Sequence, residues 1–240
     1  MVGVGVVGYG HLGQYLVESI RSHPQLELAW VWNRSSLSGK VEDDMILEDL
    51  NHCDKNSPDV IVEVAHPDIT RLVRMFISLI MFYNRQYGAK FLSVADFMIG
   101  SPTALADRDI ETALETAADH HGLYIPSGAL WGGEDIRKMS ERGTLTGLTV
   151  TMRKHPDSFK LSGDLRDKNA GVRDTAVELY HGPVRQLCPL APNNVNTMAA
   201  AAVAATNLGF DKTIGRLVSD PHIPNWHVVE VSHSINHMIN

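Results

Sequence analysis

The sequence predicts an α/β protein with an N-terminal Rossmann dinucleotide-binding domain, residues 1–128, and a second α+β domain, residues 129–240. Two observations lead to this class. Strand and helix patterns alternate through the first half, which is typical of a parallel sheet covered by helices, and a glycine-rich turn follows the first strand. The second half has mostly strand patterns, so we expect a mixed or antiparallel sheet there.

The first strand pattern, residues 2–7, is a run of small and β-branched apolar residues that suits a buried parallel strand. It leads into a G-x-G-x-x-G motif made of Gly8, Tyr9, Gly10, His11, Leu12 and Gly13. Gly8 permits a tight turn, Gly10 close approach of a pyrophosphate to the backbone, and Gly13 close packing of helix on strand. The alternative is an ordinary glycine-containing turn.

The elements after the glycine motif favour dinucleotide binding. A helix predicted at Gln14–Ser22 would direct its N–H groups at the phosphates, and a second strand is predicted at Leu26–Trp32. Enzymes that prefer NAD usually have a carboxylate at the end of that strand, but here Asn33 and Arg34 follow it. Arginine suits a 2′-phosphate, so we expect NADP to be accepted, with NAD as the alternative. Arg34 could also be a solvated arginine in a polar turn.

Composition limits the functions that this chain can have. With 44% hydrophobic residues, its 240 residues can form a large core, and a net charge of −7 argues against binding to nucleic acid. The two cysteines, Cys53 and Cys188, form no zinc motif, so we expect no bound metal, and they fit a reducing compartment. No charged leader precedes the first strand, so we expect a cytoplasmic protein.

One strongly apolar segment, Leu72–Tyr83, is interrupted only by Arg74 and Ser78. It is much shorter than the roughly 20 residues that span a bilayer, so we do not expect a membrane protein. We interpret it as a buried or partly exposed helix. If nothing covers it, it would favour aggregation or association with a membrane.

The remaining elements of the first half continue the alternation. We expect strands at Asp59–Ala65 and Phe91–Ile99 and a short strand at Leu123–Pro126. A helix is expected at Thr103–His120. Ligands of such sheets bind beyond the carboxyl ends of the strands. The residues at these ends are Gly8, Asn33, Ala65, His66, Gly100, Ser101, Ser127 and Gly128.

The second half is expected to be a mostly antiparallel sheet with one central helix, forming the substrate domain. The strand patterns lie at Leu148–Arg153, Phe159–Ser162, Ala176–Tyr180, Ile214–Val218 and Val228–Val231. The alanine-rich stretch Asn196–Thr206 is a helix by propensity. Exposed sheet in this domain makes a homodimer plausible.

Two polar segments of the second half are candidate sites. Asn194 and Asn196 stand at the start of the alanine-rich helix, where they either cap the helix or face the nicotinamide end of a cofactor or a substrate carboxylate. His227 follows a turn and enters a strand, so it is a candidate general acid or base. Most of the 12 histidines are expected on the surface.

Together, several motifs resemble the L-aspartate dehydrogenase family, and its animal branch in particular, over nearly the whole chain. They are residues 4–13 (VGVVGYGHLG), Asn33-Arg34, residues 100–107 (GSPTALAD), residues 127–133 (SGALWGG), residues 192–196 (PNNVN), Asp220-Pro221 and Asn225-Trp226-His227. Individually each motif is modest, but their order and spacing are specific.

The resemblance implies oxidation of L-aspartate by NAD or NADP to iminosuccinate, which hydrolyses to oxaloacetate and ammonia and in bacteria can feed NAD biosynthesis. It also implies that Ala129 contacts the cofactor through its backbone amide, that Asn196 binds the nicotinamide part, and that His227 is the catalytic acid or base. Positive groups must hold the two carboxylates of the substrate, and Lys154 and His155 are our candidates, together with the Asn194 amide.

Two features depart from the family pattern. The apolar stretch 72–85 looks like an insertion, and the chain stops soon after His227, where the family continues with further sheet and a helix. We therefore expect a truncated C-terminus. The alternative function is an NAD(P)-binding protein with weak or no catalysis that serves binding or regulation. A reductase of the dihydrodipicolinate or homoserine type fits residues 127–133 and 225–227 less well.

Overall fold

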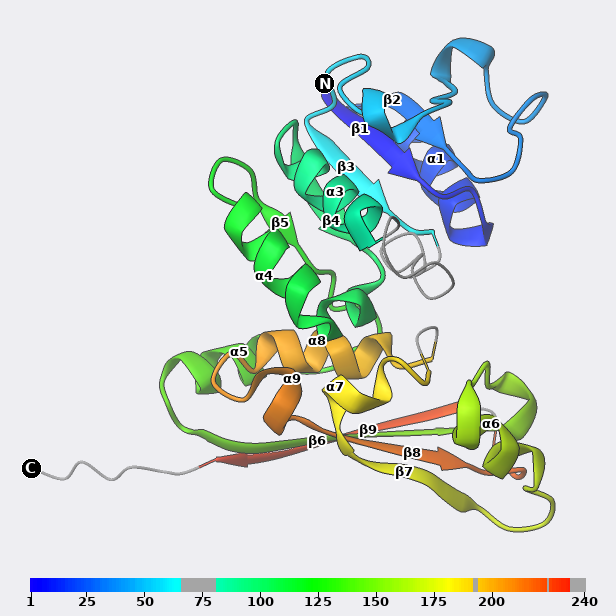
Figure 1. Ribbon diagram of the computed structural model, residues 1–240, viewed down its shortest axis with the longest axis vertical. Helices are drawn as coiled ribbons and strands as arrows, with labels where there is room; N and C mark the ends of the chain where they lie inside the picture. Colours follow the sequence, from blue (N-terminus) through cyan, green and yellow to red (C-terminus); the bar gives the residue numbers. More distant parts are fainter. Residues whose placement is uncertain (66–80, 192–193, 224, 234–240) are drawn as a thin grey trace, which may run out of the picture. The chain divides into compact units, whose positions relative to one another are not determined.

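The computed structural model describes residues 1–65, 81–191, 194–223 and 225–233 (Figure 1). Contacts within the chain divide it into two compact units, Met1–Pro126 and Ser127–Asn240. The first unit is a parallel α/β sheet and the second is a mixed sheet with helices, so the predicted fold class is confirmed.

The first unit contains a five-stranded sheet in the order β2-β1-β3-β4-β5, with every pair parallel. Its strands are β1 (Val2–Val7), β2 (Leu26–Trp32), β3 (Val60–Glu63), β4 (Asp96–Ile99) and β5 (Leu123–Tyr124). The chain runs from β1 outward to β2 and then returns to the other side of β1 for β3. The order therefore reverses between β1 and β3, which is where ligands of such sheets bind.

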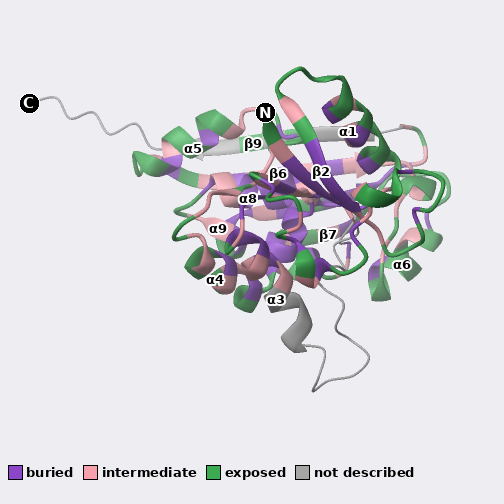
Figure 2. Cartoon of the chain, turned by 90° about the horizontal axis from the view of Figure 1, so that it is seen from above, coloured by how far each residue is buried: buried purple, intermediate pink, exposed green. Residues whose placement is uncertain are grey.

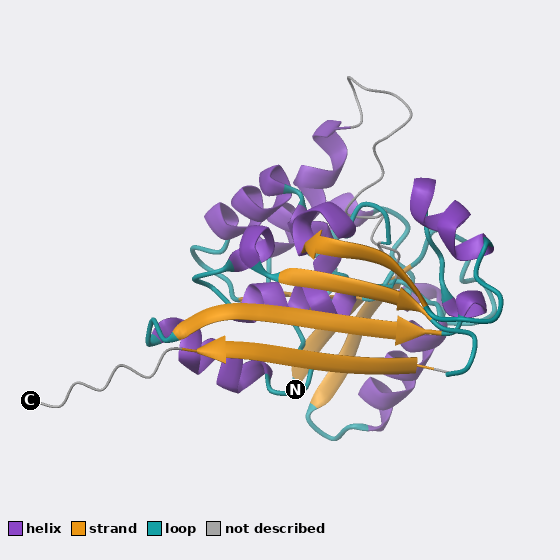
Figure 3. Ribbon diagram, turned by 90° about the horizontal axis from the view of Figure 1, so that it is seen from below, coloured by secondary structure: helices purple, strands orange, loops and turns teal. Residues whose placement is uncertain are grey.

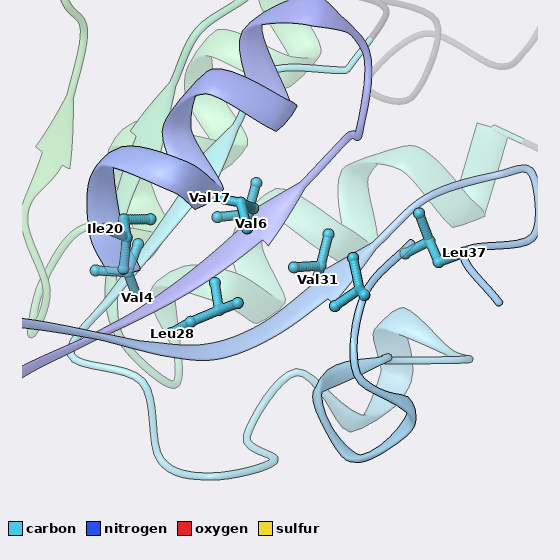
Figure 4. Close-up of a cluster of buried hydrophobic side chains, with 8 residues drawn as sticks. Val4, Val6, Val17, Ile20, Leu28, Val31 and Leu37 are labelled. Atoms are coloured by element: carbon cyan, nitrogen blue, oxygen red, sulfur yellow. The ribbon is translucent and has the colours of Figure 1, made fainter. Parts of the chain in front are cut away.

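Helix α1 (His11–Ser22) covers one face of this sheet. Its residues Val17 and Ile20 belong to one buried cluster with Val4 and Val6 of β1, and Leu28 and Val31 of β2 join it (Figure 4). Val4 and Val6 are two residues apart in a strand, so they share one face. This contact holds the helix directly behind the first strand.

The opposite face packs against a different helix. Gly5, on this face of β1, leaves room for Trp30, because a Cβ on Gly5 would come within 2.5 Å of the indole ring. The fully buried Trp30 donates from Nε1 to the carbonyl of Cys53 at 3.1 Å. Phe97 of β4 meets Phe91 of α3 (Met81–Leu92) edge to face, with ring centroids 5.2 Å apart. Figure 2 shows β1 and β2 buried over most of their length.

The structure corrects the predicted strand Phe91–Ile99. Phe91 and Leu92 end helix α3, the N–H of Ala95 still donates to the Phe91 carbonyl at 2.9 Å, and β4 begins only at Asp96. The pattern was misleading because these two buried apolar residues pack from a helix onto the sheet and simply precede a buried strand in sequence.

The predicted helix Thr103–His120 is also divided. A 3-10 helix, Pro102–Ala106, comes first, and α4 spans Arg108–Ala117. Asp107 separates them because its side chain accepts hydrogen bonds from the N–H groups of Asp109 and Ile110, which makes it the N-cap of α4.

The second unit contains a four-stranded mixed sheet in the order β7-β8-β6-β9 (Figure 3). Its strands are β6 (Leu145–Lys154), β7 (Val177–Pro183), β8 (Ile214–Ser219) and β9 (Asn225–His233). The central pair β6–β8 is parallel, whereas β7–β8 and β6–β9 are antiparallel. The expectation of a mostly antiparallel sheet thus missed the parallel pairing at its centre.

Helices lie on one face of this sheet (Figure 1). They include α5 (Gly133–Glu141), α7 (Val184–Leu187), α8 (Asn196–Ala204) and α9 (Gly209–Lys212), while α6 (Gly163–Ala170) precedes β7. Helix α8 approaches closely: a Cβ on Gly215 of β8 would lie 2.9 Å from the sulfur of Met198. The predicted helix Asn196–Thr206 ends early because Thr206 and the N–H of Asn207 bond to the Ser140 hydroxyl, at 2.8 and 2.9 Å.

The predicted strand Phe159–Ser162 is wrong, because this segment is a loop. Its backbone groups bond to other loops: the N–H of Lys160 donates to Asn194 Oδ1 at 2.9 Å, and that of Ser162 to the Leu190 carbonyl at 2.9 Å. These bonds replace the ladder that a strand would need.

Residues 72–80 of the apolar segment, and with them most of the suggested 72–85 insertion, lie outside the described residues; Met81 begins helix α3. In the part of the chain that the structure describes, no helix has both the length and the apolar character to cross a membrane.

We predict that Asp107→Ala lowers the free energy of unfolding by about 1 kcal/mol, because two N–H groups at the start of α4 lose their acceptor. Chemical denaturation measures this loss. Glu115→Ala, at an exposed position of the same helix, is the control and should change the value by no more than about 0.5 kcal/mol. Equal effects of the two variants would show that the cap is unimportant.

Candidate functional site

The turn after β1 depends on two glycines that allow very close approaches. Gly8 has φ +110°, and a Cβ there would lie 2.7 Å from the backbone nitrogen of Ala65. A Cβ on Gly13 would lie 2.0 Å from the Gly8 carbonyl oxygen, so only glycine lets α1 begin this close to the turn. The N–H of Gly8 donates to the Trp32 carbonyl at 2.8 Å. The turn is therefore held against both neighbouring strands.

Gly10 is exposed, and a Cβ at this position would have no atom within 4 Å. It is the N-cap of α1 and makes no side-chain capping bond, and the first helical residues, His11 and Leu12, are exposed. The start of α1 thus has N–H groups that no capping side chain bonds, next to open space. This arrangement fits the phosphates of a dinucleotide.

Asn33 joins the turn to the end of β2. Its Oδ1 accepts from the N–H of Tyr9 at 3.2 Å, and its Nδ2 donates to the Ser35 carbonyl at 3.1 Å. The exposed Arg34 beside it lines a cavity of about 460 Å³ whose other lining residues are Asn33, Ser35, Ser36, Leu37, Ser38, Asp43, Ile46, Leu47 and Glu48. Hydroxyls and a guanidinium suit a phosphate or ribose, while Asp43 and Glu48 add negative charge to the same cavity.

Sequence reasoning missed Glu63, which ends β3 at the same edge of the sheet. Its side chain is buried, Ser101 donates to it from both N–H and Oγ, at 3.1 and 3.3 Å, and the N–H of Ala65 donates as well. Burial raises the pKa of Glu63 to about 7, although these hydrogen bonds lower it in part. A carboxylate inside the apolar run 60–64 was the signal that could have found it.

Ala65 lies beside the turn, because its nitrogen would be 2.7 Å from a Cβ on Gly8, and it is partly buried. His66, which was predicted to bind the cofactor with it, lies outside the described residues, as do Pro192 and Asn193 of the second unit. Ala129 is exposed in the loop before α5, between Gly128 and Gly132, which both have positive φ.

In the second unit, the chain before α8 is tied to the loop after β6. The buried Asn194 donates to the Ser158 carbonyl at 3.2 Å and accepts from the N–H of Lys160 at 2.9 Å. Asn196 begins α8, and its Oδ1 is buried without a hydrogen-bond partner among the described residues. Because Oδ1 itself is inaccessible to solvent, a further donor could reach it only after the side chain moves.

Lys154 and His155 stand where β6 ends. Burial lowers the pKa of Lys154, and its carbonyl accepts from the N–H of Asp220 at 2.9 Å. His155 accepts through Nδ1 from the N–H of Asp157 at 3.3 Å and lines a cavity of about 310 Å³. Arg173, which the sequence analysis did not single out, lines the same cavity.

His227 belongs to β9, where its backbone is opposite Met152 of β6, two positions from the pair formed by Asn225 and Lys154. Its side chain lies outside the described part of the chain. The second unit thus brings the backbone of His227 and the residue Lys154 to the same end of the sheet. Within the described ranges, no group of three or more His, Cys, Asp or Glu side chains could hold a metal ion.

Known proteins share both the sequence and the fold of this chain. Residues 135–236 match the family "Aspartate dehydrogenase, C-terminal". The chain is 55% identical to an aspartate dehydrogenase domain-containing protein of Xenopus tropicalis over 235 residues, 95% of this chain and 78% of that protein. It is 34% identical to an L-aspartate dehydrogenase of Methanocella arvoryzae over 139 residues, 56% of this chain and 50% of that enzyme.

A solved structure adds the fold. The crystal structure of aspartate dehydrogenase from Thermotoga maritima superimposes with a TM-score of 0.74 at 20% identity, over 98% of this chain and 86% of that one. The glycine turn on a parallel sheet, the mixed second sheet and these similarities agree. The chain therefore belongs to the L-aspartate dehydrogenase family, in the branch of animal aspartate dehydrogenase domain-containing proteins.

Proposed function

We propose that this chain catalyses the NAD(P)-dependent oxidative deamination of L-aspartate to iminosuccinate, which water hydrolyses to oxaloacetate and ammonia. The observation that carries the proposal is the open glycine turn at Gly10 in a member of this family. The substrate follows from the name of the Methanocella arvoryzae relative, an L-aspartate dehydrogenase.

The cofactor would be held mainly by the first unit. The residues that we assign to it there are Gly8, Gly10, His11, Leu12, Gly13, Asn33, Arg34, Ala65 and His66, with Ala129 and Asn196 from the second unit. When bound, its nicotinamide supplies the acceptor for the hydride that leaves Cα of aspartate. Both NADP and NAD are candidates, because Arg34 favours a 2′-phosphate and the carboxylates Asp43 and Glu48 oppose it.

His227 would act as the acid or base that handles the proton of the amine or of the attacking water. Lys154 and His155 would attract the substrate carboxylates, and the partly desolvated Lys154 would gain most from a negative partner. The Asn194 amide is hydrogen-bonded to Ser158 and Lys160. Its role in substrate binding would therefore be indirect, by holding the loop that follows His155.

We also propose that two copies associate through the face of the second sheet that no described helix covers (Figure 3). The other face presents a mixture of charged, hydroxyl and apolar residues, including Thr151, His181, Arg216 and Val228, which pair across the strands. Light scattering should give twice the mass of the chain.

We expect the reaction to take place in the cytoplasm, where the buried thiols of Cys53 and Cys188 stay reduced.

Turnover tests the proposed activity. Aspartate-dependent reduction of NAD or NADP by the purified chain, followed by the absorbance of the reduced nicotinamide, would support it. The second candidate is a dinucleotide-binding protein without catalysis, which is favoured by the domain-containing name of the Xenopus tropicalis relative. Tight binding of the cofactor without turnover would support that candidate, and absence of binding would reject both.

We predict that Gly10→Val folds but binds NADPH at least about tenfold more weakly. Gly10 has φ −73°, which valine also adopts, and its Cβ would extend into the open space that the phosphates require. Loss of one charge-assisted hydrogen bond alone costs about 1.5–3 kcal/mol. Fluorescence titration measures the affinity. Gly3→Ala in the preceding strand β1 is the control, because its Cβ would make ordinary 3.5 Å contacts. Unchanged NADPH affinity in folded Gly10→Val would reject this turn as the phosphate site.

Arg34→Ala should weaken NADPH more than NADH, by a differential of roughly tenfold or more, because only NADPH has a 2′-phosphate for the guanidinium. Arg34→Lys keeps the charge without the planar fork and should give an intermediate differential. Titration with both cofactors gives these ratios. Equal losses for NADPH and NADH would leave Arg34 without a part in cofactor choice.

His227→Ala should lower kcat by about 10²–10⁴ with almost unchanged affinity for NAD(P)H, since a proton-transfer group acts on the reaction step. The wild-type rate should follow a group that titrates near neutral pH, and the variant should lose that dependence. His222→Ala, in the preceding turn, is the control and should keep kcat near the wild-type value. Full turnover by folded His227→Ala would reject this residue as the acid or base.

A further inference from the structure

Glu63 occupies a central place at the edge of the sheet where the cofactor is proposed to bind. It is the last residue of β3 and pairs with Val7 of β1 on one side and Ile99 of β4 on the other. Its side chain is only 1% exposed. A carboxyl group at this depth is costly unless its oxygens are hydrogen-bonded or protonated.

The Glu63 carboxyl joins the two loops that follow β3 and β4. It accepts from the N–H of Ala65 in the first loop and from the N–H of Ser101 in the second, the latter at 3.1 Å. The Ser101 hydroxyl lies between two acceptors, 3.3 Å from Glu63 Oε1 and 3.5 Å from the Ala65 carbonyl oxygen. This hydroxyl can therefore serve either the carboxylate or the backbone of Ala65.

The backbone of Ala65 forms one wall of the glycine turn. Its nitrogen and Cα lie 2.7 and 2.8 Å from the position of a Cβ on Gly8, and the preceding N–H, that of Val64, donates to the Val7 carbonyl at 2.9 Å. A shift of Ala65 toward the turn would therefore bring it against Gly8. Glu63, Ser101, Ala65 and Gly8 thus make one contiguous path from a buried carboxyl to the proposed phosphate site.

The protonation of Glu63 is governed by its surroundings within the sheet. Its pKa is raised to about 7 by burial, and the groups that lower it again are the hydrogen bonds from Ala65 and Ser101. Its register partners Val7 and Ile99 do not titrate. The titratable groups on the adjoining turn, helix and strand end are Tyr9, His11 and Arg34. Their charges are not among the causes of the raised pKa of Glu63. His66 lies outside the described residues.

We propose that Glu63 is a positioning residue of the dinucleotide site, and that its carboxylate takes up a proton when the pyrophosphate binds at the adjoining glycine turn. The inference rests on the proposed cofactor binding. The two phosphates bring negative charge to the turn, which disfavours a second negative charge behind Ala65. A solvent proton binds Oε1, which then donates to the Ser101 hydroxyl, and this hydroxyl donates to the Ala65 carbonyl. Binding of the cofactor thereby fixes the wall of its own site.

The proposed proton uptake by Glu63 determines how cofactor affinity changes with pH. Because the cofactor prefers the protonated carboxyl, the dissociation constant for NADH should rise as pH increases from about 6 to about 8.5. Each unit by which binding raises the pKa of Glu63 corresponds to a tenfold change, so we expect a rise of about tenfold for a one-unit shift. NADH is the probe because it lacks a 2′-phosphate that titrates in this range.

Glu63→Gln tests the proposal, since glutamine keeps an acceptor and a donor but cannot titrate. The variant should bind NADH at pH 8.5 about as tightly as the wild type does at pH 6, with a flat pH profile. Isothermal titration calorimetry in two buffers of different ionisation enthalpy measures proton uptake directly, and should find it for the wild type near pH 7.5 and not for the variant. Equal proton uptake by the wild type and Glu63→Gln would overturn the proposal.

Further variants keep the test decisive. If circular dichroism shows that Glu63→Gln does not fold, Ser101→Ala replaces it. Without the Ser101 hydroxyl, NADH should bind more weakly at pH 6. An unchanged dependence of NADH affinity on pH would contradict the proposed hydrogen bonds from Glu63 through Ser101 to Ala65. His11→Asn and His66→Asn should retain the pH-dependent part of binding whatever their absolute affinity, and its loss in either would assign the proton to that histidine. A wild type that does not bind NADH at any pH would contradict the proposed function itself, whereas binding with unchanged proton uptake contradicts only the role of Glu63.

Discussion

The close approach between the turn after β1 and the chain after β3 is the constraint on which the rest of the first unit depends. A Cβ on Gly8 would lie 2.7 Å from the nitrogen of Ala65, and one on Gly13 would lie 2.0 Å from the Gly8 carbonyl. Both distances are impossible for a side chain, so strand β1, helix α1 and strand β3 can meet only if these positions are glycine. The contact also determines that the start of α1 lies at the point where the strand order reverses.

A buried carboxyl behind this contact is an unusual component of a parallel sheet. An apolar residue in place of Glu63 would avoid the cost of desolvation, and the neighbouring positions of β3 are apolar. Glu63 instead supplies acceptors for the N–H groups of Ala65 and Ser101. These residues lie beyond the ends of the strands, so no neighbouring strand offers their N–H groups an acceptor. A side chain from the sheet therefore holds the backbone of Ala65 and Ser101, the residues that follow the ends of β3 and β4.

Sequence reasoning predicted the first unit better than the second, for physical reasons. Glycine spacing and β-branched runs reflect local sterics, so β1, α1 and β2 were found. Phe91 and Leu92 were assigned to a strand because burial from a helix and burial in a strand give the same apolar letters. The parallel pairing of β6 with β8 depends on which strands become neighbours in the sheet. The alternation of apolar and polar residues along a strand does not specify its neighbours. Glu63 was missed because a single carboxylate in a strand usually marks an exposed position, and Arg173 because its cavity forms only in the folded chain.

Two unpaired polar oxygens of the second unit differ in how close their residues lie to solvent. Asn196 Oδ1 and Thr213 Oγ1 are both buried without a hydrogen-bond partner among the described residues, which costs about 1–3 kcal/mol for each group. Thr213 is 0% exposed, so no ligand can reach its hydroxyl without opening the fold. Asn196 is only partly buried and begins α8, where the small side chains of Ala199 and Ala200 follow. A rotation of the Asn196 side chain would therefore bring Oδ1 to solvent, whereas Thr213 Oγ1 has no such route.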